Sequence, residues 1–444
     1  MLNRPVYHFA PVKNWMNDPN GTVYRNGTYH LFYQYNPEGS SWGNICWAYA
    51  TSSDLINWQR KGIRLRPEPQ KGERYCFSGC ALPQGDGYLM AYTSIGFEEW
   101  AIQQHARQRF ARANSDFTRI ERLYDLDLDE RSQPFVVQEW RDPFIFSYLG
   151  AHYLLLCGVV WKNGKAENNV LLYRATNKDC TAWAYVSTLF SDPDRVIECP
   201  NMLVQNGKAA LLYSTTTDRN VKYVAGDFDG TRLWERRRGA VDWSQKCFYA
   251  TNLSECAEGG NVLYGWLQED LKEGDSPDGE RSGCLAIPRS IRIDDDYRLH
   301  FAPVPQLRSL QGEALGAADN EIAGGGVRAR LQFTTCGECR LHITESERER
   351  ITVRVRDGEA IVGRVTHFPR AGETEERMAV GDGEKHTFDV LIDGSVTEFF
   401  VDGTAALSVR MYRTETPEKL FSLKEGKVED LQAWNMQSAS VVGE

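Results

Sequence analysis

The amino-acid sequence predicts an all-β protein, a five-bladed β-propeller followed by a C-terminal β-sandwich. Short alternating or aromatic runs bounded by Gly, Asp and Asn dominate the chain, whereas helical periodicity is scarce. A segment with Ala followed by Asp recurs about every 50 to 65 residues, which leaves room for some four short strands per repeat. No helices of crossover length alternate with the strands, so a TIM barrel is disfavoured.

Five copies of the repeat cover the first two thirds of the chain. The copy that contains Ala50 and Asp54 is the clearest, and the last two copies are weaker. Five units that end near Pro305 predict a five-bladed propeller over residues 1–305. The repeats are centred on Asp54, Asp116, Asp179, Asp229 and Asp294.

The remaining third of the chain has a different pattern. Residues 306–326 are rich in small residues and include a Gly triplet, which indicates a linker or domain seam. Strands with one apolar face resume in residues 327–444, joined by Asp-Gly turns at 357–358, 393–394 and 402–403. This pattern predicts a β-sandwich, which carries no evident acid–base cluster and is interpreted as a packing or binding module.

Composition excludes several classes of function. The net charge of −10 argues against nucleic acid or an anionic membrane as a partner, because both attract basic surfaces. The longest apolar run, 153–161, is too short for a membrane helix, and no secretion signal is evident near Met1. Eleven scattered cysteines fit a reducing compartment, so the expected location is the cytoplasm.

Three acidic motifs stand immediately before strand-like runs. They are Asn17-Asp18-Pro19, Arg141-Asp142-Pro143 and Glu198-Cys199-Pro200. Each lies at the start of a predicted blade, where the innermost strand lines the central channel of a propeller. Although each motif alone could be an ordinary turn, the set predicts that Asp18, Asp142 and Glu198 converge on that channel.

Converging carboxylates are what cleavage of a glycosidic bond requires. One carboxylate attacks or stabilises an oxocarbenium-like centre, and another, protonated, donates to the leaving oxygen. Arg141 should favour an ionised Asp142. The apolar sequence neighbours of Glu198 suit the protonated form that an acid needs.

The ordered motifs resemble glycoside hydrolase family 32, which includes invertases, levanases, inulinases and sucrose-6-phosphate hydrolases. The three acidic motifs, Phe77-Ser78-Gly79 and Leu31–Pro37 occur in the order and rough spacing of that family. The C-terminal stretch 393–403 is similar to the sandwich module of the family. The resemblance covers nearly the whole chain and is carried by several independent motifs.

The resemblance implies retaining chemistry on a terminal β-D-fructofuranosyl unit of sucrose or a short fructo-oligosaccharide. Asp18 would be the nucleophile, Asp142 the transition-state stabiliser and Glu198 the acid/base. Neither a metal nor another cofactor is expected, and the partner would be a small carbohydrate. The pocket would be shaped by Asn17, Gln34, Trp42, Phe77, Ser78, Arg141, Tyr249 and Trp266.

Two segments depart from the family pattern. Ala48-Tyr49-Ala50 stands where many members carry Gly-His-Ala, which would place an aromatic ring near the pocket rim. Trp100 matches no pocket position and is either a stacking platform or a packed side chain. Linkage preference therefore stays open, as do exo or endo action and oligomeric state.

Four other functions share parts of the pattern that predicts a β-fructofuranosidase. A fructosyltransferase would use the same three acids with a sugar in place of water, and a sucrose-6-phosphate hydrolase would take a phosphorylated substrate. A fructan-binding protein without activity is disfavoured by the intact acids. An arabinoside-cleaving propeller is disfavoured by the Asn17–Gly21 match.

Overall fold

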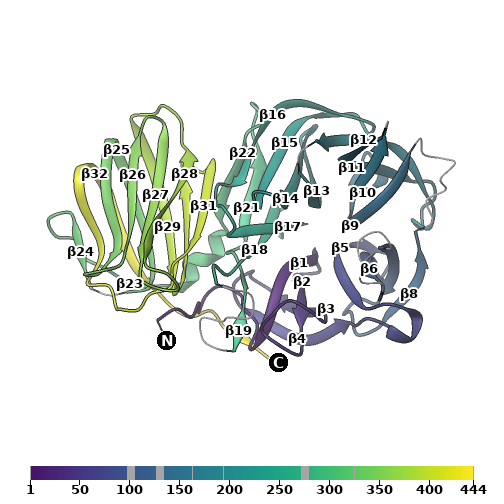
Figure 1. The fold of residues 1–444 in the computed structure, drawn as a ribbon, viewed down its shortest axis with the longest axis horizontal. Coiled ribbons are helices and arrows are strands. Elements are labelled where there is room, and N and C mark those ends of the chain that lie inside the picture. The colour runs from purple at the N-terminus through teal and green to yellow at the C-terminus, as the bar shows by residue number, and fades with distance from the viewer. Residues whose placement is uncertain are drawn as a thin grey trace.

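The protein is built from β-strands arranged as a propeller and a sandwich (Figure 1). The computed structural model describes residues 2–97, 106–126, 135–162, 164–193, 195–271, 280–324 and 326–443. Within these ranges the helices are single 3₁₀ segments, among them Pro69–Lys71 and Pro305–Leu310. An all-β fold with a propeller and a sandwich-like C-terminal domain is thus confirmed.

Four antiparallel sheets repeat one pattern, in which four consecutive strands lie side by side in sequence order. Two of them contain β1 to β8 and two contain β9 to β16. The first sheet also receives two strands from distant parts of the chain, described below. The bounds are β1 Asn14–Arg25, β2 Thr28–Asn36, β3 Cys46–Ser52, β4 Trp58–Leu65, β5 Tyr75–Gln84, β6 Gly87–Ile95, β7 Arg107–Ala113, β8 Ile120–Asp125, β9 Val136–Tyr148, β10 Ala151–Lys162, β11 Lys165–Ala175, β12 Trp183–Asp192, β13 Ile197–Gln205, β14 Lys208–Thr215, β15 Asn220–Phe228 and β16 Leu233–Asp242.

The prediction of five blades was wrong, because the regular blade occurs four times in the described residues. The unit after β16 is an irregular five-stranded sheet whose third strand is split, since β20 and β21 both pair with β18. Between them, the Ile287 amide donates to Glu398 of the sandwich and Pro288 has no N–H, so the ladder is interrupted. Its strands are β17 Phe248–Glu255, β18 Asn261–Leu267, β20 Cys284–Leu285, β21 Arg289–Ile293 and β22 Leu299–Pro303.

The sequence repeat encodes the turn after the third strand of a unit. Asp54 accepts the amides of Ile56 and Asn57 at 3.0 and 2.8 Å, which closes the turn between β3 and β4. Asp229 and Asp294 accept backbone amides in the corresponding turns before β16 and β22. The repeat therefore preserves an aspartate whose carboxylate accepts backbone amides of the turn in which it lies.

The C-terminal domain is a single ten-stranded sheet that folds over to enclose its own apolar core. The 18-residue strands β25 and β32 run side by side and connect its parts. Asp357 and Gly358 have φ of 51° and 72°, as a two-residue hairpin between β26 and β27 requires. Its strands are β23 Gln311–Ala314, β24 Glu321–Ala323, β25 Arg328–Glu345, β26 Arg350–Arg356, β27 Glu359–Thr366, β28 Gly372–Ala379, β29 Lys385–Asp393, β30 Val396–Val401, β31 Ala405–Arg410 and β32 Lys419–Met436.

The segment 306–326 contributes strands to the sandwich sheet, since β23 and β24 both pair with β32. The two domains also exchange their ends. Residues 6–8 bind the sandwich through the Asp393 carboxylate, while β33 (Val441–Val442) pairs with β4 of the first blade. β19 (Arg281–Ser282) pairs in parallel with β1 of the same sheet.

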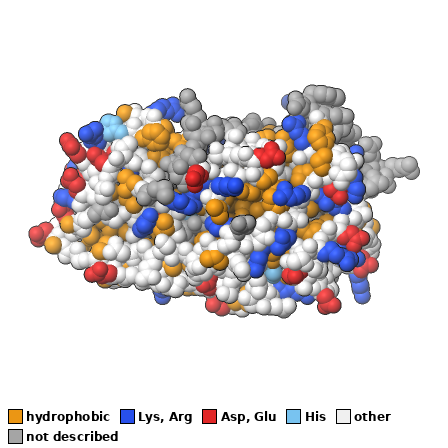
Figure 2. Space-filling view, turned by 90° about the horizontal axis from the view of Figure 1, so that it is seen from below, with side chains coloured by type: hydrophobic (Ala, Val, Ile, Leu, Met, Phe, Trp, Pro, Cys, Tyr) orange, Lys and Arg blue, Asp and Glu red, His pale blue; other side chains and the backbone are white. Residues whose placement is uncertain are grey.

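Charges of both signs are interspersed on the molecular face in Figure 2, and no broad field of one sign covers it. Among the described residues no helix is long and apolar enough to cross a bilayer.

Candidate active site

The first strand of each propeller sheet lines a narrow central axis. A cavity of about 10 Å³ there is lined from five sheets, for example by Asn20, Ser78 and Asn201. Hydrogen bonds join neighbouring inner strands, such as Gly79 N–H to Asn20 Oδ1 at 3.2 Å. The inner strands are thus packed almost to closure below the carboxylates.

A β-bulge interrupts every inner strand at the same level. Register shifts occur between Met16 and Pro19, between Cys76 and Gly79, and between Glu198 and Asn201, and equivalent shifts lie in β9 and β17. A bulge re-aims side chains that a regular pleat would place on the two faces of the sheet. These bulges explain how residues 124 and 56 positions apart in the sequence can meet at one end of the axis.

Asp18, in the bulge of β1, lies in a hydrogen-bond network with three of the predicted pocket residues. Asn17 Nδ2 donates to its Oδ1 at 3.0 Å, and Ser78 Oγ donates to its Oδ2 at 2.5 Å. Gln34 links these two donors, since Asn17 donates to Gln34 Oε1 at 2.7 Å and Gln34 Nε2 donates to Ser78 Oγ at 2.6 Å. The carboxylate is therefore held in one orientation.

Gly79 allows the close contact between β5 and β6 that brings Ser78 to Asp18. A Cβ at this position would lie 2.0 Å from the Ala91 carbonyl oxygen, so no larger residue fits between β5 and β6. The Phe77-Ser78-Gly79 motif thus combines the donor to Asp18 with the close strand contact that positions it.

Asp142, the second of the three acids, is buried and has a backbone φ of 60°. Its Oδ2 accepts the Cys199 amide at 2.9 Å, and its own amide donates to Thr93 Oγ1 at 2.9 Å. The Cys199 Sγ lies 3.7 Å from Oδ2 of both Asp142 and Asp18. Two of the three carboxylates are therefore brought together around one thiol.

Glu198 is held by two donors. Arg141 Nη1 donates to its Oε1 at 2.8 Å, and the Tyr249 hydroxyl donates to its Oε2 at 2.7 Å. The surroundings of Glu198 are therefore more polar than its sequence neighbours indicate. Arg141 binds Glu198 although Asp142 is its neighbour in the chain.

Burial dominates the electrostatics of the two aspartates. It raises the pKa of Asp18, and the hydrogen bonds from Ser78 and Asn17 oppose it only in part. Burial also raises the pKa of Asp142 to about 7, against the lowering effect of Arg141 and with a further increase from Glu198. The expectation that Arg141 keeps the Asp142 pKa low is corrected, since desolvation outweighs the attraction of the Arg141 charge. Burial raises the pKa of Tyr249, which keeps its hydroxyl protonated as a donor.

Aromatic side chains surround the carboxylates. Trp42 is 41% exposed and meets Phe77 edge-on at 5.9 Å between ring centroids, which places both rings at an open rim. Trp266 is buried and packs edge-on against Trp15 at 5.6 Å. Its indole Nε1 is buried without a hydrogen-bond partner, so it has a free donor. Asn17, Gln34, Ser78, Arg141 and Tyr249 therefore lie in the hydrogen-bond network around Asp18 and Glu198, whereas Trp42, Phe77 and Trp266 are placed by contacts between aromatic rings.

Sequence reasoning missed several contributors to the site. Trp15 donates from Nε1 to Asn17 Oδ1 at 2.9 Å, and the Arg219 guanidinium lies 4.7 Å from the Tyr249 ring centroid. Trp15 lies two residues before the Asn17-Asp18-Pro19 motif and could have been found there. Thr93 and Arg219 carry no local signal, because only tertiary packing brings them to the site.

Two further sequence expectations concern positions away from the carboxylates. Trp100 lies outside the described residues. Tyr49 is buried and packs against Phe32 and Phe117 between the first two blades. Its hydroxyl binds His30 at 2.6 Å and contacts none of the three carboxylates.

Comparisons with known proteins identify the family of the chain. The family model for the glycosyl hydrolases family 32 N-terminal domain matches residues 8–303, and that for the C-terminal domain matches residues 306–435. The chain is 26% identical to the raffinose invertase of Escherichia coli, with 92% of this chain and 89% of that protein aligned. It is 30% identical to the rice (Oryza sativa subsp. japonica) beta-fructofuranosidase insoluble isoenzyme 3, covering 72% of this chain and 60% of the relative's length.

Among solved structures, the sucrose-6-phosphate hydrolase from Lactobacillus gasseri superposes with a TM-score of 0.84 at 21% identity. The superposition covers 98% of this chain and 93% of that one, which shows that the fold is shared over both domains. The family models together span both domains and include all three carboxylates. The chain therefore belongs to the glycosyl hydrolases of family 32.

Proposed function

We propose that this protein is a retaining β-fructofuranosidase that releases terminal β-D-fructofuranosyl units from sucrose or short fructo-oligosaccharides. The observation that carries the proposal is the meeting of Asp18, Asp142 and Glu198 from three blades, each with its own hydrogen-bond donors. The names of the invertase and beta-fructofuranosidase relatives support the same substrate class.

The proposed reaction has two steps. Asp18 attacks the anomeric carbon of fructose while Glu198 gives its proton to the glycosidic oxygen, so the carbon–oxygen bond breaks and the leaving sugar departs. Water then attacks the same carbon, Glu198 takes its proton, and the bond to Asp18 breaks. Two displacements retain the configuration of the sugar.

The remaining groups serve orientation and charge. Ser78, Asn17 and Gln34 hold Asp18 in the position for attack. Arg141 and Tyr249 hold Glu198 and stabilise the negative charge that it carries after proton donation. Asp142 has a pKa near neutrality. It can accept hydrogen bonds from the fructose hydroxyls when ionised, and donate one to them when protonated.

The decisive experiment is product analysis with sucrose at low and high concentration. We expect equal amounts of free fructose and glucose at all concentrations. Longer oligomers with little free fructose would identify a fructosyltransferase instead. Absence of any turnover on sucrose, sucrose 6-phosphate, inulin-type and levan-type oligomers would identify a binding protein.

A second candidate, a sucrose-6-phosphate hydrolase, is favoured by Arg219. Its guanidinium lies over the Tyr249 ring, beside the carboxyl that faces the leaving group in the proposed reaction, and it donates to Gln268. An arginine at this place suits a phosphate on the leaving sugar. A kcat/KM for sucrose 6-phosphate far above that for sucrose, lost selectively in Arg219→Gln, would establish this candidate.

We also propose a cytoplasmic location. The eleven cysteines are all unpaired, which suits a reducing compartment.

A further inference from the structure

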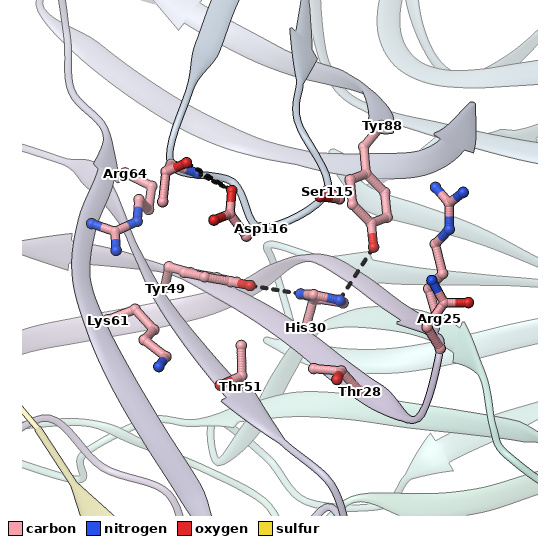
Figure 3. Close-up of a pocket in the computed structure, with 12 residues that line it drawn as sticks. Arg25, Thr28, His30, Tyr49, Thr51, Lys61, Arg64, Tyr88, Ser115 and Asp116 are labelled. Atoms are coloured by element: carbon pink, nitrogen blue, oxygen red, sulfur yellow. Dashed lines mark hydrogen bonds between the residues drawn. The ribbon is translucent and has the colours of Figure 1, made fainter. Parts of the chain in front are cut away.

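A cavity of about 420 Å³ is lined by residues of the first two blades (Figure 3). This volume is in the range of small-molecule sites. Its lining comes from strands β1, β2, β3, β4 and β6 and from the turns that follow β1 and β7, and it includes Arg25 of β1 and Arg64 of β4. We propose that this cavity binds a small sugar phosphate.

Three cations line the cavity, whereas Asp116 is the only acid among the described residues that line it. In a chain with a net charge of −10 this is a local excess of positive charge. In the described part of the chain none of Arg25, Lys61 and Arg64 forms an ion pair. The charge of the cavity is therefore available to an anion.

The arginines differ in how many donors they have free. Arg25 donates to the carbonyls of Gly85 and Gly87 at 2.6 and 2.8 Å. Arg64 stands over the Tyr49 ring at 5.9 Å, and its Nε is buried with no hydrogen-bond partner. The Arg64 side chain as a whole is half-buried, and a buried N–H within it that has no partner is costly unless a ligand satisfies it. Arg64 is thus the side chain that the proposed phosphate would satisfy.

A histidine bridge supplies a further donor. His30 binds the Tyr49 hydroxyl through Nδ1 at 2.6 Å and the Tyr88 hydroxyl through Nε2 at 3.2 Å, as the dashed lines in Figure 3 show. Burial lowers the pKa of His30 to about 4, so the ring is neutral and has one N–H and one lone pair. In either tautomer one tyrosine accepts from the ring and keeps its own O–H for another acceptor.

The remaining lining favours a sugar over a nucleotide. Tyr88 is stacked on Phe117 at 4.2 Å and has the Arg25 guanidinium 5.5 Å from its ring centroid. Tyr49 is stacked on Phe32 at 4.7 Å and has Arg64 at 5.9 Å, so both rings already have partners where a base would stack. Hydroxyl and amide groups complete the surface and suit the hydroxyls of a sugar. These groups belong to Asn26, Thr28, Thr51, Ser115 and Thr118.

The cavity is separate from the carboxylate site. His30 and Gln34 lie on the same face of β2, with Phe32 between them, because side chains alternate along a strand. Four residues of strand separate their Cα atoms by about 13 Å. A ligand in the cavity would therefore lie one buried aromatic ring away from the network that holds Asp18.

Calorimetric titration of the full chain with glucose 6-phosphate, glucose and inorganic phosphate tests the proposal. We expect glucose 6-phosphate to bind, glucose to bind at least about tenfold more weakly, and inorganic phosphate to lie between them. Arg64→Gln should weaken glucose 6-phosphate binding about tenfold or more. Arg119→Gln is the matched control, because Arg119 is an exposed cation of the adjoining turn outside the lining, and its affinity should be that of wild type.

Three results would overturn the proposal entirely, and a fourth would reject the sugar as part of the ligand. The first is no binding of glucose 6-phosphate, and the second is equal affinity for glucose and its phosphate. The third is unchanged affinity in both Arg64→Gln and Lys61→Gln with wild-type melting temperatures, which would place the binding elsewhere, including at the carboxylates. Equal affinity for inorganic phosphate would reject the sugar and leave a simple anion site.

Discussion

Asp142 occupies a backbone conformation that non-glycine residues seldom adopt, in a buried position where its charge is costly. Its φ of 60° turns the carboxyl toward Cys199, whose own φ is 49°. Asp142 lies in the bulge of β9 and Cys199 in the bulge of β13. Their left-handed backbone conformations bring the Asp142 carboxyl and the Cys199 amide together. Strain of this kind is maintained only where the surrounding strands determine it.

The raised pKa of Asp142 predicts a pH-dependent stability. The folded pKa of about 7 lies above the ordinary value of 3.8, so the folded state holds a proton that the unfolded chain has lost between these values. Stability from this group is therefore present at the acid end and falls as pH rises from about 4 to about 7. We expect Asp142→Asn to gain melting temperature over wild type progressively across this window.

Melting curves at several pH values check this prediction. Asp86→Asn, in the exposed turn between β5 and β6, is the control and should follow wild type. A constant difference between Asp142→Asn and wild type at all pH values would contradict it.

Asp18→Asn should abolish turnover while the protein stays folded. The change keeps the shape of the side chain and its contacts with Ser78 and Gln34 but removes the attacking charge. We expect kcat to fall by about 10⁴-fold or more. Initial rates on sucrose measure the loss, a melting curve checks the fold, and a variant with more than a tenth of the wild-type rate would refute the role.

Tyr249→Phe should impair the proposed acid without removing it. The Tyr249 hydroxyl donates to Glu198, and a hydrogen bond to a charged group is worth about 1.5–3 kcal/mol. We expect kcat/KM to fall about 10- to 100-fold, together with a shift in the pH–rate profile. Tyr297→Phe, which loses a hydrogen bond to Asp227 away from the site, should keep the wild-type profile; a shift there as well would remove the explanation through Glu198.

The sequence predicted the three carboxylates because each motif lies at the start of a blade. It could not predict that Arg141 binds Glu198, because these residues are 57 positions apart and only the bulges orient them. Nor could it predict that the pKa of Asp142 rises, because burial depends on strands that are distant in the sequence.

At the scale of elements, the irregular fifth sheet is where the propeller meets the sandwich. Arg289 of β21 donates to Asp242 at 2.7 Å and to Glu398 of β30 at 2.9 Å, and all three side chains are fully buried. His8 Nε2 donates to Glu398 Oε1 at 3.0 Å, because an ionised carboxylate can only accept. This group joins the N-terminal segment, two propeller sheets and the sandwich through charges that have no access to water.

Glu398→Gln should destabilise the whole chain. Removing one partner of a buried ion group leaves the others uncompensated, at a cost of about 3–5 kcal/mol. Burial raises the pKa of Glu398. Hydrogen bonds and charge from His8 and Arg289 outweigh this effect and hold the pKa at about 2. This group therefore contributes stability above pH 4.5, which is lost as the pH falls toward 2.

Chemical denaturation at neutral pH measures the effect of Glu398→Gln. Glu425→Gln provides the comparison, because Glu425 pairs with Arg340 at an exposed site of the same domain and should cost about 0–1 kcal/mol. Similar costs for the two variants would show that the buried group adds nothing to stability.

The repeat in the sequence predicted the elements of the regular blades because it reports the capped turn of each one. It failed for the last unit because that turn, at Asp294, is kept although the third strand is broken. The interruption comes from Glu398, about a hundred residues later, and no local pattern signals it.

At the scale of the whole molecule, the sequence established the class of fold and the order of the two domains. It did not reveal that the ends of the chain exchange domains. β33 enters the first blade as its outermost strand, and Trp58 donates its amide to Ser440 at 2.8 Å. We therefore expect one cooperative thermal transition for both domains.

Deletion of residues 438–444 tests this coupling. The loss of β33 removes backbone bonds from the first blade, so the melting temperature monitored by propeller tryptophans should fall. A deletion that lowers only the stability of the sandwich would contradict the expectation.

The crossed ends also limit how this chain can be inherited or engineered. A gene cut after the propeller region would separate the sandwich from the segment 6–8 that its Asp393 binds, and the first blade from β33. Each of the two separated domains would lack a segment that its sheet binds in the whole chain. Recombination that exchanges either domain alone would therefore be selected against. Reassembly from two separately produced fragments, in contrast, would be guided by two reciprocal contacts, which makes this boundary a natural position for a split reporter enzyme.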